Sequence, residues 1–318
     1  MTDPVDTTRS PRFAQVASFA RLPLSRDLGK ARSVFIGVPW DDATSFRSGA
    51  RDGPSAIRSN SRLVRPYNMF QKVYPFRVLE TVDYGDIDPV PGFLEDTFRR
   101  IEEGFEPILA AGIVPFAAGG DHSVTLPILR AQKAATGRPV RLLHFDAHFD
   151  TWESYWGDKR YTHGTWVKHA YEEGLIEPGS VFQVGIRSSL YSDADVANNA
   201  ALVQRTYTIE DVVARPEKSI ADELVQALGS GPTYVSLDID VLDPAYAPGT
   251  GTPEPGGMTS LQLIHFLREL ARLDVVGFDL VEVAPQYDHY GQVTAMTAAH
   301  LFFEAMSAVA RRRIAPPH

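Results

Sequence analysis

Short runs of apolar residues, rich in β-branched and aromatic side chains, recur along the chain. They lie at residues 34–38, 113–118, 140–145, 181–186, 234–237 and 275–280. Most are apolar throughout rather than alternating with polar residues, which is typical of strands that are buried on both faces of a parallel sheet. The pattern therefore predicts six buried strands at these positions.

Longer segments with helical spacing of apolar residues and a charged opposite face lie between these runs. They cover residues 93–111, 123–134, 219–228, 260–273 and 297–311. Strands that alternate with helices form a sheet covered on both faces. We therefore predict an α/β fold with three layers, in which a mainly parallel sheet is flanked by helices. Residues 1–30 are expected to form an irregular N-terminal arm, and residues 31–318 a single catalytic domain.

Composition and charge limit the classes of function. The chain has 318 residues, 44% of them hydrophobic, and carries 31 Lys plus Arg against 40 Asp plus Glu, a net charge of −9. Without a basic run, nucleic acid and anionic membranes are poor candidates as partners. No signal-peptide core and no run of about 18 apolar residues is apparent, so we expect a cytoplasmic protein without membrane contact. Cysteine is absent, so a metal site here must use oxygen and nitrogen ligands.

Carboxylates and imidazoles are concentrated where three of the predicted strands end. These residues are His122, then Asp146, His148 and Asp150, then Asp238 and Asp240. In an extended segment, residues two positions apart point to the same side, and the carboxyl ends of parallel strands meet at one edge of the sheet. So many buried acids would repel one another strongly unless cations neutralise them. Oxygen and nitrogen ligands at this density suit two divalent metals, which activate water for hydrolysis. The sequence predicts a binuclear metallohydrolase.

The motifs around these residues carry a family resemblance. They are GVPWDDATSFRSGARDGPSAIR, GGDHS, HFDAHFD, YTHGT, SLDIDVLDPAYAPGTGTPEPGG and GFDLVEVAPQYD, in that order. From about Phe35 to the C-terminus, the chain resembles the ureohydrolases, which include arginases, agmatinases, guanidino-acid hydrolases and proclavaminate amidinohydrolase. The resemblance implies the arginase-type fold, two Mn(II) ions, hydrolysis of a guanidino group to urea and an amine, and a homotrimer or homohexamer. Because the ligands are nitrogen and oxygen, Ni(II) is an alternative metal.

The resemblance also assigns roles to residues. It implies that one metal is bound by His122, Asp146, Asp150 and Asp238, and the other by Asp146, His148, Asp238 and Asp240. His163 matches the family's mobile histidine and would supply a proton to the departing nitrogen. Glu282 matches the glutamate that pairs with the guanidinium, and Asp150 could accept a hydrogen bond from the nucleophile. Asp279, two residues before Glu282, is expected to be a hydrogen-bond acceptor behind the ligands.

The segment after HFDAHFD is unusually rich in aromatic residues and is predicted to form the rim of the substrate site. The candidate rim residues are Trp152, Glu153, Trp156, Trp166 and Arg187. Aromatic rings could hold a small cationic guanidino substrate by cation–π contact.

The charged residues near this rim leave the substrate's tail open. A distal amine, as in agmatine, needs an acid, for which the candidates are Glu153, Asp42 and Asp193. A guanidino acid such as 4-guanidinobutanoate needs a cation, for which the candidates are Lys159, Arg160 and Arg187. We expect one of these two substrate types first. Guanidine, alkylated guanidines or a biguanide such as metformin, with nickel or manganese, form the alternative.

Two further classes compete with this interpretation. Single-zinc deacetylases share the arginase fold but need fewer ligands than the six found here. A non-catalytic partner subunit of a hetero-oligomeric ureohydrolase would be expected to have lost ligands, whereas this chain keeps all six together with His163 and Glu282. Both alternatives therefore rank below an active hydrolase.

Overall fold

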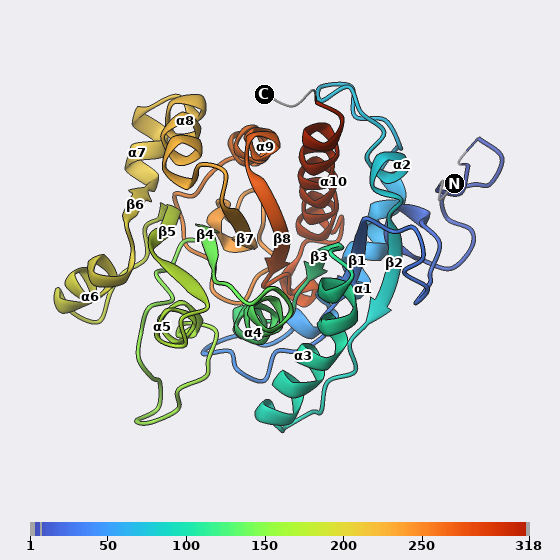
Figure 1. Ribbon diagram of the computed structural model, residues 1–318. Coiled ribbons are helices and arrows are strands. Elements are labelled where there is room, and N and C mark those ends of the chain that lie inside the picture. Colours follow the sequence, from blue (N-terminus) through green and yellow to red (C-terminus); the bar gives the residue numbers. More distant parts are fainter. Residues whose placement is uncertain (1–3, 7, 316–318) are drawn as a thin grey trace.

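The computed structural model describes residues 4–6 and 8–315 and contains one eight-stranded sheet in which all strands are parallel (Figure 1). The strand order is β2-β1-β3-β8-β7-β4-β5-β6. The strands are β1 (Ser33–Gly37), β2 (Val82–Asp86), β3 (Val114–Ala118), β4 (Val140–Phe145), β5 (Ile176–Ile186), β6 (Arg205–Thr208), β7 (Pro232–Asp238) and β8 (Asp274–Val281). This confirms the predicted α/β class and the parallel sheet.

The six predicted strands are the six inner strands of the sheet, and the two that the pattern did not predict are its edges. β2 reads VDYGD and β6 reads RTYT, so both carry more polar residues than the inner strands. An edge strand has a neighbour on one side only and commonly carries polar residues there. For that reason the edge strands lack the continuous apolar run that marks a buried strand.

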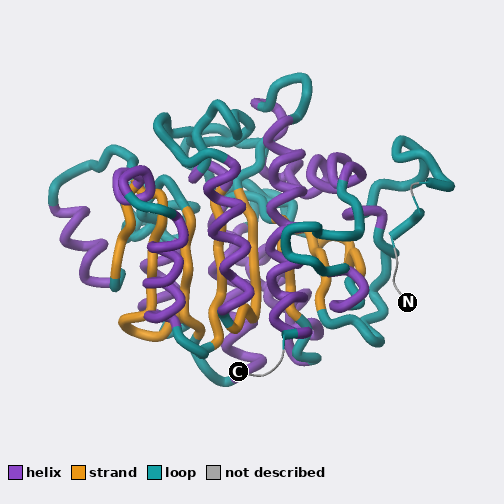
Figure 2. Tube along the Cα trace, turned by 90° about the horizontal axis from the view of Figure 1, so that it is seen from above, coloured by secondary structure: helices purple, strands orange, loops and turns teal. Residues whose placement is uncertain are grey.

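Helices cover both faces of the sheet, as Figures 1 and 2 show. The ten helices of the described chain are α1 (Gly53–Asn60), α2 (Pro75–Leu79), α3 (Leu94–Ala110), α4 (Thr125–Thr136), α5 (Trp166–Glu172), α6 (Ala194–Leu202), α7 (Ile209–Ala214), α8 (Glu217–Leu228), α9 (Ser260–Glu269) and α10 (Val293–Ile314). Helices α8, α9 and α10 lie over one face and α3, α4 and α5 over the other. The five predicted helices correspond to α3, α4, α8, α9 and α10, and the five not predicted have nine residues or fewer.

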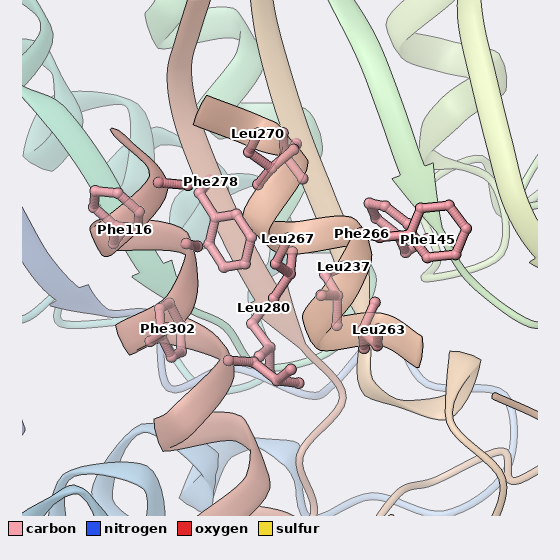
Figure 3. Close-up of a cluster of buried hydrophobic side chains, with 14 of the residues drawn as sticks. Phe116, Phe145, Leu237, Leu263, Phe266, Leu267, Leu270, Phe278, Leu280 and Phe302 are labelled. Carbon is pink, nitrogen blue, oxygen red and sulfur yellow. The ribbon is translucent and has the colours of Figure 1, made fainter. Parts of the chain in front are cut away.

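The core between the sheet and α9 and α10 is built from interlocking aromatic and branched side chains (Figure 3). Phe278 of β8 meets Phe302 of α10 edge-on, with ring centroids 5.5 Å apart. α10 has 22 residues, and its most apolar 18-residue window has a mean hydropathy of 1.3, so by length and composition it could cross a membrane, contrary to the expectation that no segment approaches that limit. However, 78% of its most apolar window is buried within the fold, and packing against the sheet accounts for its apolar character.

The described part of the N-terminal segment is irregular but firmly attached to the domain. Phe19, in a single 3-10 turn, is fully buried and stacks on Phe35 of β1, with ring centroids 4.3 Å apart. Its backbone N–H donates to Asp83 of β2 at 2.7 Å, and Arg58 donates to the same carboxylate at 2.8 Å. This segment therefore completes the core beside β1 and β2.

Candidate metal centre and substrate cavity

Four strands that are neighbours in the centre of the sheet end in the loops that carry the candidate ligands. In sheet order they are β3, β8, β7 and β4. The loops after β3, β8 and β4 carry His122, Glu282, and Asp146 with His148 and Asp150, respectively, while Asp238 is the last residue of β7 and Asp240 follows it. Although these residues are far apart in sequence, adjacency of the strands brings them to one edge of the sheet, as expected for an open α/β sheet.

The turn after β3 requires glycine at residue 120. A Cβ atom on Gly120 would lie 1.5 Å from the backbone oxygen of Trp40, so any other residue would force the two segments apart. The next residue, Asp121, donates its backbone N–H to the same oxygen at 2.8 Å. This close approach explains the GG pair in the GGDHS motif and fixes His122 at the start of a buried 3-10 turn.

The first candidate metal position is centred on His122. Its Nδ1 lies 3.2 Å from Asp146 Oδ2, 3.1 Å from Asp150 Oδ2 and 3.3 Å from Asp238 Oδ2. This nitrogen is buried and has no hydrogen-bond partner among the described residues. An orphaned imidazole nitrogen that faces three carboxylate oxygens is the arrangement expected around a cation.

The second candidate position lies on the other side of Asp146. His148 Nδ1 is 3.3 Å from Asp146 Oδ1 and 3.1 Å from Asp240 Oδ2. Asp146 therefore turns one oxygen toward His122 and the other toward His148, so it belongs to both groups of potential ligand atoms. The structure brings all six predicted ligands together in this cluster.

The electrostatics of the cluster favour bound cations. Burial and then the charges of Asp240 and Asp146 raise the pKa of Asp238 well above its ordinary value. Divalent cations would remove this repulsion and allow the buried carboxylates to stay ionised. By donor type, burial and grouping, these residues fit two divalent cations, with oxygen and nitrogen ligands only.

A second layer of hydrogen bonds orients His122. Its Nε2 lies 2.8 Å from Ser236 Oγ, and Ser236 donates to Asp279 at 2.6 Å. Asp279 also accepts from the Tyr234 hydroxyl at 2.8 Å. The prediction that Asp279 is an acceptor behind the ligands is confirmed.

Two residues beneath the cluster differ from the sequence prediction. Trp166 was expected on the rim, but it is fully buried, donates its Nε1–H to Asp150 Oδ2 at 2.8 Å and packs on His122 with ring centroids 4.8 Å apart. Trp166 is the first residue of α5, and it supports the ligands through these two contacts with Asp150 and His122. His144 was not predicted, yet its Nε2 lies 2.8 Å from Asp146 Oδ2. The signal was present, since His144 precedes Asp146 by two residues in a strand.

His163 and Glu282 meet beside the candidate metal positions. His163 Nδ1 lies 2.9 Å from Glu282 Oε1, which also accepts the backbone N–H of His122 at 3.0 Å. Glu282 Oε2 is buried and has no partner among the described residues. Both Glu282 (φ 64°) and Asp150 (φ 55°) adopt the left-handed backbone region, which is strained for these residues and is often found at functional sites.

A cavity of about 300 Å³ opens above this cluster. Its lining includes His122, His148, Asp150, His163 and Asp238, so it reaches the candidate metal positions directly. Its outer wall carries three aromatic residues in mutual contact, with ring centroids 5.7 to 6.2 Å apart: Trp152, Tyr155 and Tyr191. Trp152 therefore lies where the sequence predicted a rim. Trp156 packs on Tyr155 with its side chain directed to solvent, and it does not line the cavity.

The charged residues considered for the substrate tail lie elsewhere. Arg187 donates to backbone oxygens of the 240–242 and 254–255 segments, so it clamps two loops together and is not free to bind a carboxylate. Lys159 pairs with Asp158 on the exposed loop, and Arg160 lies beside Glu172. Glu153 borders a neighbouring cavity and Asp42 pairs with Arg51, while Asp193 precedes α6.

One acid that lines the cavity without belonging to the predicted ligands, Glu254, was not predicted. Its Oε1 lies 3.7 Å from His148 Nε2. It belongs to the Gly- and Pro-rich segment that follows Asp240.

Comparison with known proteins gives consistent matches over nearly the whole chain. The sequence model described as the arginase family matches residues 31–308. The chain is 45% identical over 307 residues to a guanidinopropionase of Pseudomonas aeruginosa, covering 96% of each protein. It is 40% identical to a guanidinobutyrase of the same species, covering 95% of each. Among solved structures, proclavaminate amidinohydrolase from Streptomyces clavuligerus matches with a TM-score of 0.89 and 38% identity, covering 95% of this chain and all of that one.

Proposed function

Because the chain belongs to the arginase family, we propose that it is a binuclear-metal hydrolase that cleaves a C–N bond of a small guanidino compound to give urea and an amine. His122, Asp146, Asp150 and Asp238 would hold one cation, and Asp146, His148, Asp238 and Asp240 the other. When bound, two such cations lower the pKa of water from about 16 toward 7 and so supply a nucleophile at neutral pH. The donor set suits Mn(II) first and Ni(II) as the alternative.

The observation that carries this proposal is the free oxygen of Glu282. Within the part of the chain that the structure describes, this buried Oε2 has no hydrogen-bond partner, and the other oxygen of the same carboxylate accepts the His122 backbone N–H. An unpaired buried acceptor costs free energy unless a ligand satisfies it. A guanidinium is planar, cationic and rich in N–H donors, so it matches such an acceptor well. Glu282 would therefore bind the guanidinium and orient its carbon toward the cluster.

Two further residues, His163 and Asp150, would provide a proton donor and a hydrogen-bond acceptor for the reaction. His163 contacts the other oxygen of Glu282, Oε1, through its Nδ1, and it can supply a proton to the departing nitrogen. Asp150 keeps one oxygen on Trp166 Nε1, and it faces the same cavity, where it can accept a hydrogen bond from the attacking water. These roles require no movement of the buried strands.

The first substrate candidates are agmatine and a guanidino acid such as 4-guanidinobutanoate. For the amine of agmatine, Glu254 is an acid in the cavity wall. For a carboxylate, the cavity lining of the described chain offers no Lys or Arg, so hydroxyl and backbone donors would have to bind it. The names of the relatives, guanidinopropionase and guanidinobutyrase, support a guanidino acid.

A second candidate is supported by the aromatic wall. Trp152, Tyr155 and Tyr191 offer ring surfaces that suit an alkylated guanidine, a biguanide such as metformin, or guanidine itself. Such substrates need neither an acid nor a base for a tail, and they rank second here.

The test is urea release by the metal-free protein reloaded with Mn(II) or Ni(II), using agmatine, 4-guanidinobutanoate, 3-guanidinopropanoate, arginine, guanidine, dimethylguanidine and metformin. A further set of matched length, 3-guanidinopropanoate, N-propylguanidine and 3-guanidinopropylamine, varies only the charge of the tail. Turnover of one compound with two metals bound per chain supports the proposal. No urea release with two bound metals would mean that the substrate is not in this panel, whereas no urea release and no bound metal would favour an incomplete assembly or a non-catalytic subunit that requires a homologous partner.

We also propose that the protein forms a homotrimer or homohexamer. Met69 and Phe70, neighbours on a turn next to α10, are 68% and 63% exposed, and an adjacent pair of exposed apolar side chains suits a subunit contact. The mass measured by light scattering would decide between one, three and six copies.

A further inference from the structure

Both ring nitrogens of His163 are already occupied. Nδ1 lies 2.9 Å from Glu282 Oε1, and Nε2 lies 2.7 Å from the hydroxyl oxygen of Ser45. The ring is also largely buried, with 8% of the residue exposed. In this arrangement His163 has no nitrogen that points freely at a substrate, so a proton leaving Nε2 meets Ser45 first.

Ser45, the hydrogen-bond partner of that nitrogen, lines the cavity as His163 does. It is exposed, and it lines the cavity together with His148 and Asp150. Its backbone N–H also donates to His163 Nε2, at 3.0 Å. The hydroxyl therefore contacts the imidazole on one side and is accessible to a bound substrate on the other.

The segment that carries Ser45 is fixed relative to the candidate metal centre. The backbone N–H of His163 donates to the Ala43 carbonyl at 3.2 Å, and the Ala43 N–H donates to Asp121 Oδ2 at 2.9 Å. Asp121 directly precedes His122, so one of these hydrogen bonds joins the segment to the His163 loop and the other joins it to the ligand turn. Groups held in this way need little reorganisation during a reaction.

We propose that Ser45 is a further catalytic residue, which relays a proton from His163 to the departing nitrogen; this rests on the proposed hydrolysis of a guanidino group. The Ser45 hydroxyl gives its proton to the nitrogen as the C–N bond breaks and the bonding pair stays on that nitrogen. Oγ simultaneously takes the proton from Nε2. Ser45 ends as a neutral hydroxyl and His163 as a neutral imidazole whose Nδ1–H remains on Glu282.

The surroundings of His163 suit such an exchange. The negative charges of Glu282, Asp121 and Asp150 favour the protonated ring. The Ser45 N–H opposes it, since that donor loses its acceptor when Nε2 is protonated. The ring can thus take up a proton and release it again, as a general acid must.

The test compares Ser45→Ala and Ser45→Thr with Ser48→Ala as a matched control in the same segment. Ser48 is exposed and offers its carbonyl, not its hydroxyl, to Tyr287. Loss of general acid catalysis predicts a fall in kcat of about 100-fold for Ser45→Ala with KM changed less than about threefold. Ser45→Thr keeps the hydroxyl and should recover most of that loss, and Ser48→Ala should match the wild type.

A double variant separates a relay from a merely structural role. If Ser45 acts only through His163, adding Ser45→Ala to His163→Ala should cause no further fall in kcat, because both belong to one proton path. Independent multiplication of the two losses, or a kcat for Ser45→Ala within twofold of the wild type, would overturn the relay.

A measurement without turnover keeps this proposal distinct from the proposed function. If the wild type hydrolyses no guanidino compound, the proposed function fails, and the contact can still be examined by ¹⁵N NMR of the protein loaded with diamagnetic Zn(II). The His163 signals would be assigned by their loss in His163→Asn. A shift of the Nε2 signal in Ser45→Ala, but not in Ser48→Ala, is expected, and an unchanged signal would reject the hydrogen bond on which the relay depends.

Discussion

The floor and the rim of the cavity are built in different ways. We use floor for the six residues His122, Asp146, His148, Asp150, Asp238 and Asp240, and rim for Trp152, Tyr155, Tyr191 and Glu254. The floor is carried by three of the four central strands and is almost wholly buried. The rim comes from three loops and is partly exposed, with Tyr191 78% exposed.

The floor is also held by more hydrogen bonds to the backbone than the rim is. In the floor, carboxylates bind the backbone of their own turns: the His148 N–H donates to Asp146 at 2.6 Å and the Asp240 N–H to Asp238 at 2.8 Å. In the rim, the aromatic residues rest mainly on one another, and Trp152 Nε1 has no partner among the described residues. The reaction is therefore fixed by the fold, whereas substrate choice depends on loops that can change without disturbing it.

Breaking the floor should produce the largest effect. Asp238→Asn removes a charge from a carboxylate at the end of β7 that faces His122. Loss of a ligand should weaken metal binding by more than the roughly 100-fold typical of outer partners, and urea release should fall below detection at limiting metal. Bound metal would be measured by elemental analysis after dialysis.

The matched control for this change is Asp158→Asn, on the exposed loop between the rim residues, where the side chain is 83% exposed. It should leave metal content and activity unchanged. Full activity of Asp238→Asn at limiting metal would contradict the assignment of the floor.

The support beneath the floor should give the next largest effect. Trp166→Phe keeps the ring that packs on His122 but removes the Nε1–H that donates to Asp150. Loss of such an outer hydrogen bond should weaken metal binding by about tenfold. Titration of the metal-free protein with Mn(II), monitored by activity, measures this change. If Trp166→Phe altered substrate preference and left metal binding intact, Trp166 would belong to the rim after all.

How far the sequence predicted the fold depended on burial. The inner strands have mostly apolar residues and could be located from pattern alone to within two residues at each end, except that β5 begins five residues before the predicted start, in the more polar stretch IEPGS. The edge strands β2 and β6 could not, because strand pairing on one side tolerates polar residues. The order of the strands in the sheet was also not predictable from the pattern, because it depends on the face of the sheet over which each helical connection passes.

The same difference applies to the site. The predicted ligands lie where strands end, and within each motif they are two positions apart, so their side chains point to one side. The six floor residues could therefore be predicted together. The rim depends on loop paths, which the spacing of residues does not reveal. Of two tryptophans in the same stretch, Trp152 lines the cavity, whereas Trp166 begins α5 and is fully buried. Arg187 was misjudged for a related reason, since its backbone partners come from segments more than 50 residues away.

Changing the rim should affect affinity more than the chemical step. Trp152→Ala removes one wall of the cavity and its contacts with Tyr155 and Tyr191. Loss of cation–π and apolar contact should raise KM about fivefold with little change in kcat. Trp156→Ala is the control, because Trp156 is in the same loop, 60% exposed, and outside the cavity lining. Equal effects of the two substitutions on KM would mean that the loop acts as a whole and that Trp152 does not contact the substrate.

The smallest expected effect concerns the pH dependence of kcat. It tests whether the protonation of His163 is independent of the rim. Burial lowers the pKa of His163, but the neighbouring Glu282 carboxylate outweighs it, so the pKa lies above the ordinary value of 6.5. If protonated His163 is required, kcat is full below this pKa and is lost as the pH rises through it, giving an alkaline limb above about 6.5. A kcat–pH profile of the wild type measures the limb.

The same profile of a rim variant tests whether the rim affects this proton. Because His163 Nδ1 and Nε2 contact Glu282 and Ser45, neither of which belongs to the rim, Trp152→Ala should leave the limb in place even while KM rises. A limb at or below 6.5 would mean that Glu282 does not govern the proton on His163, and a limb that moves in Trp152→Ala would show that the rim and the proton donor are coupled.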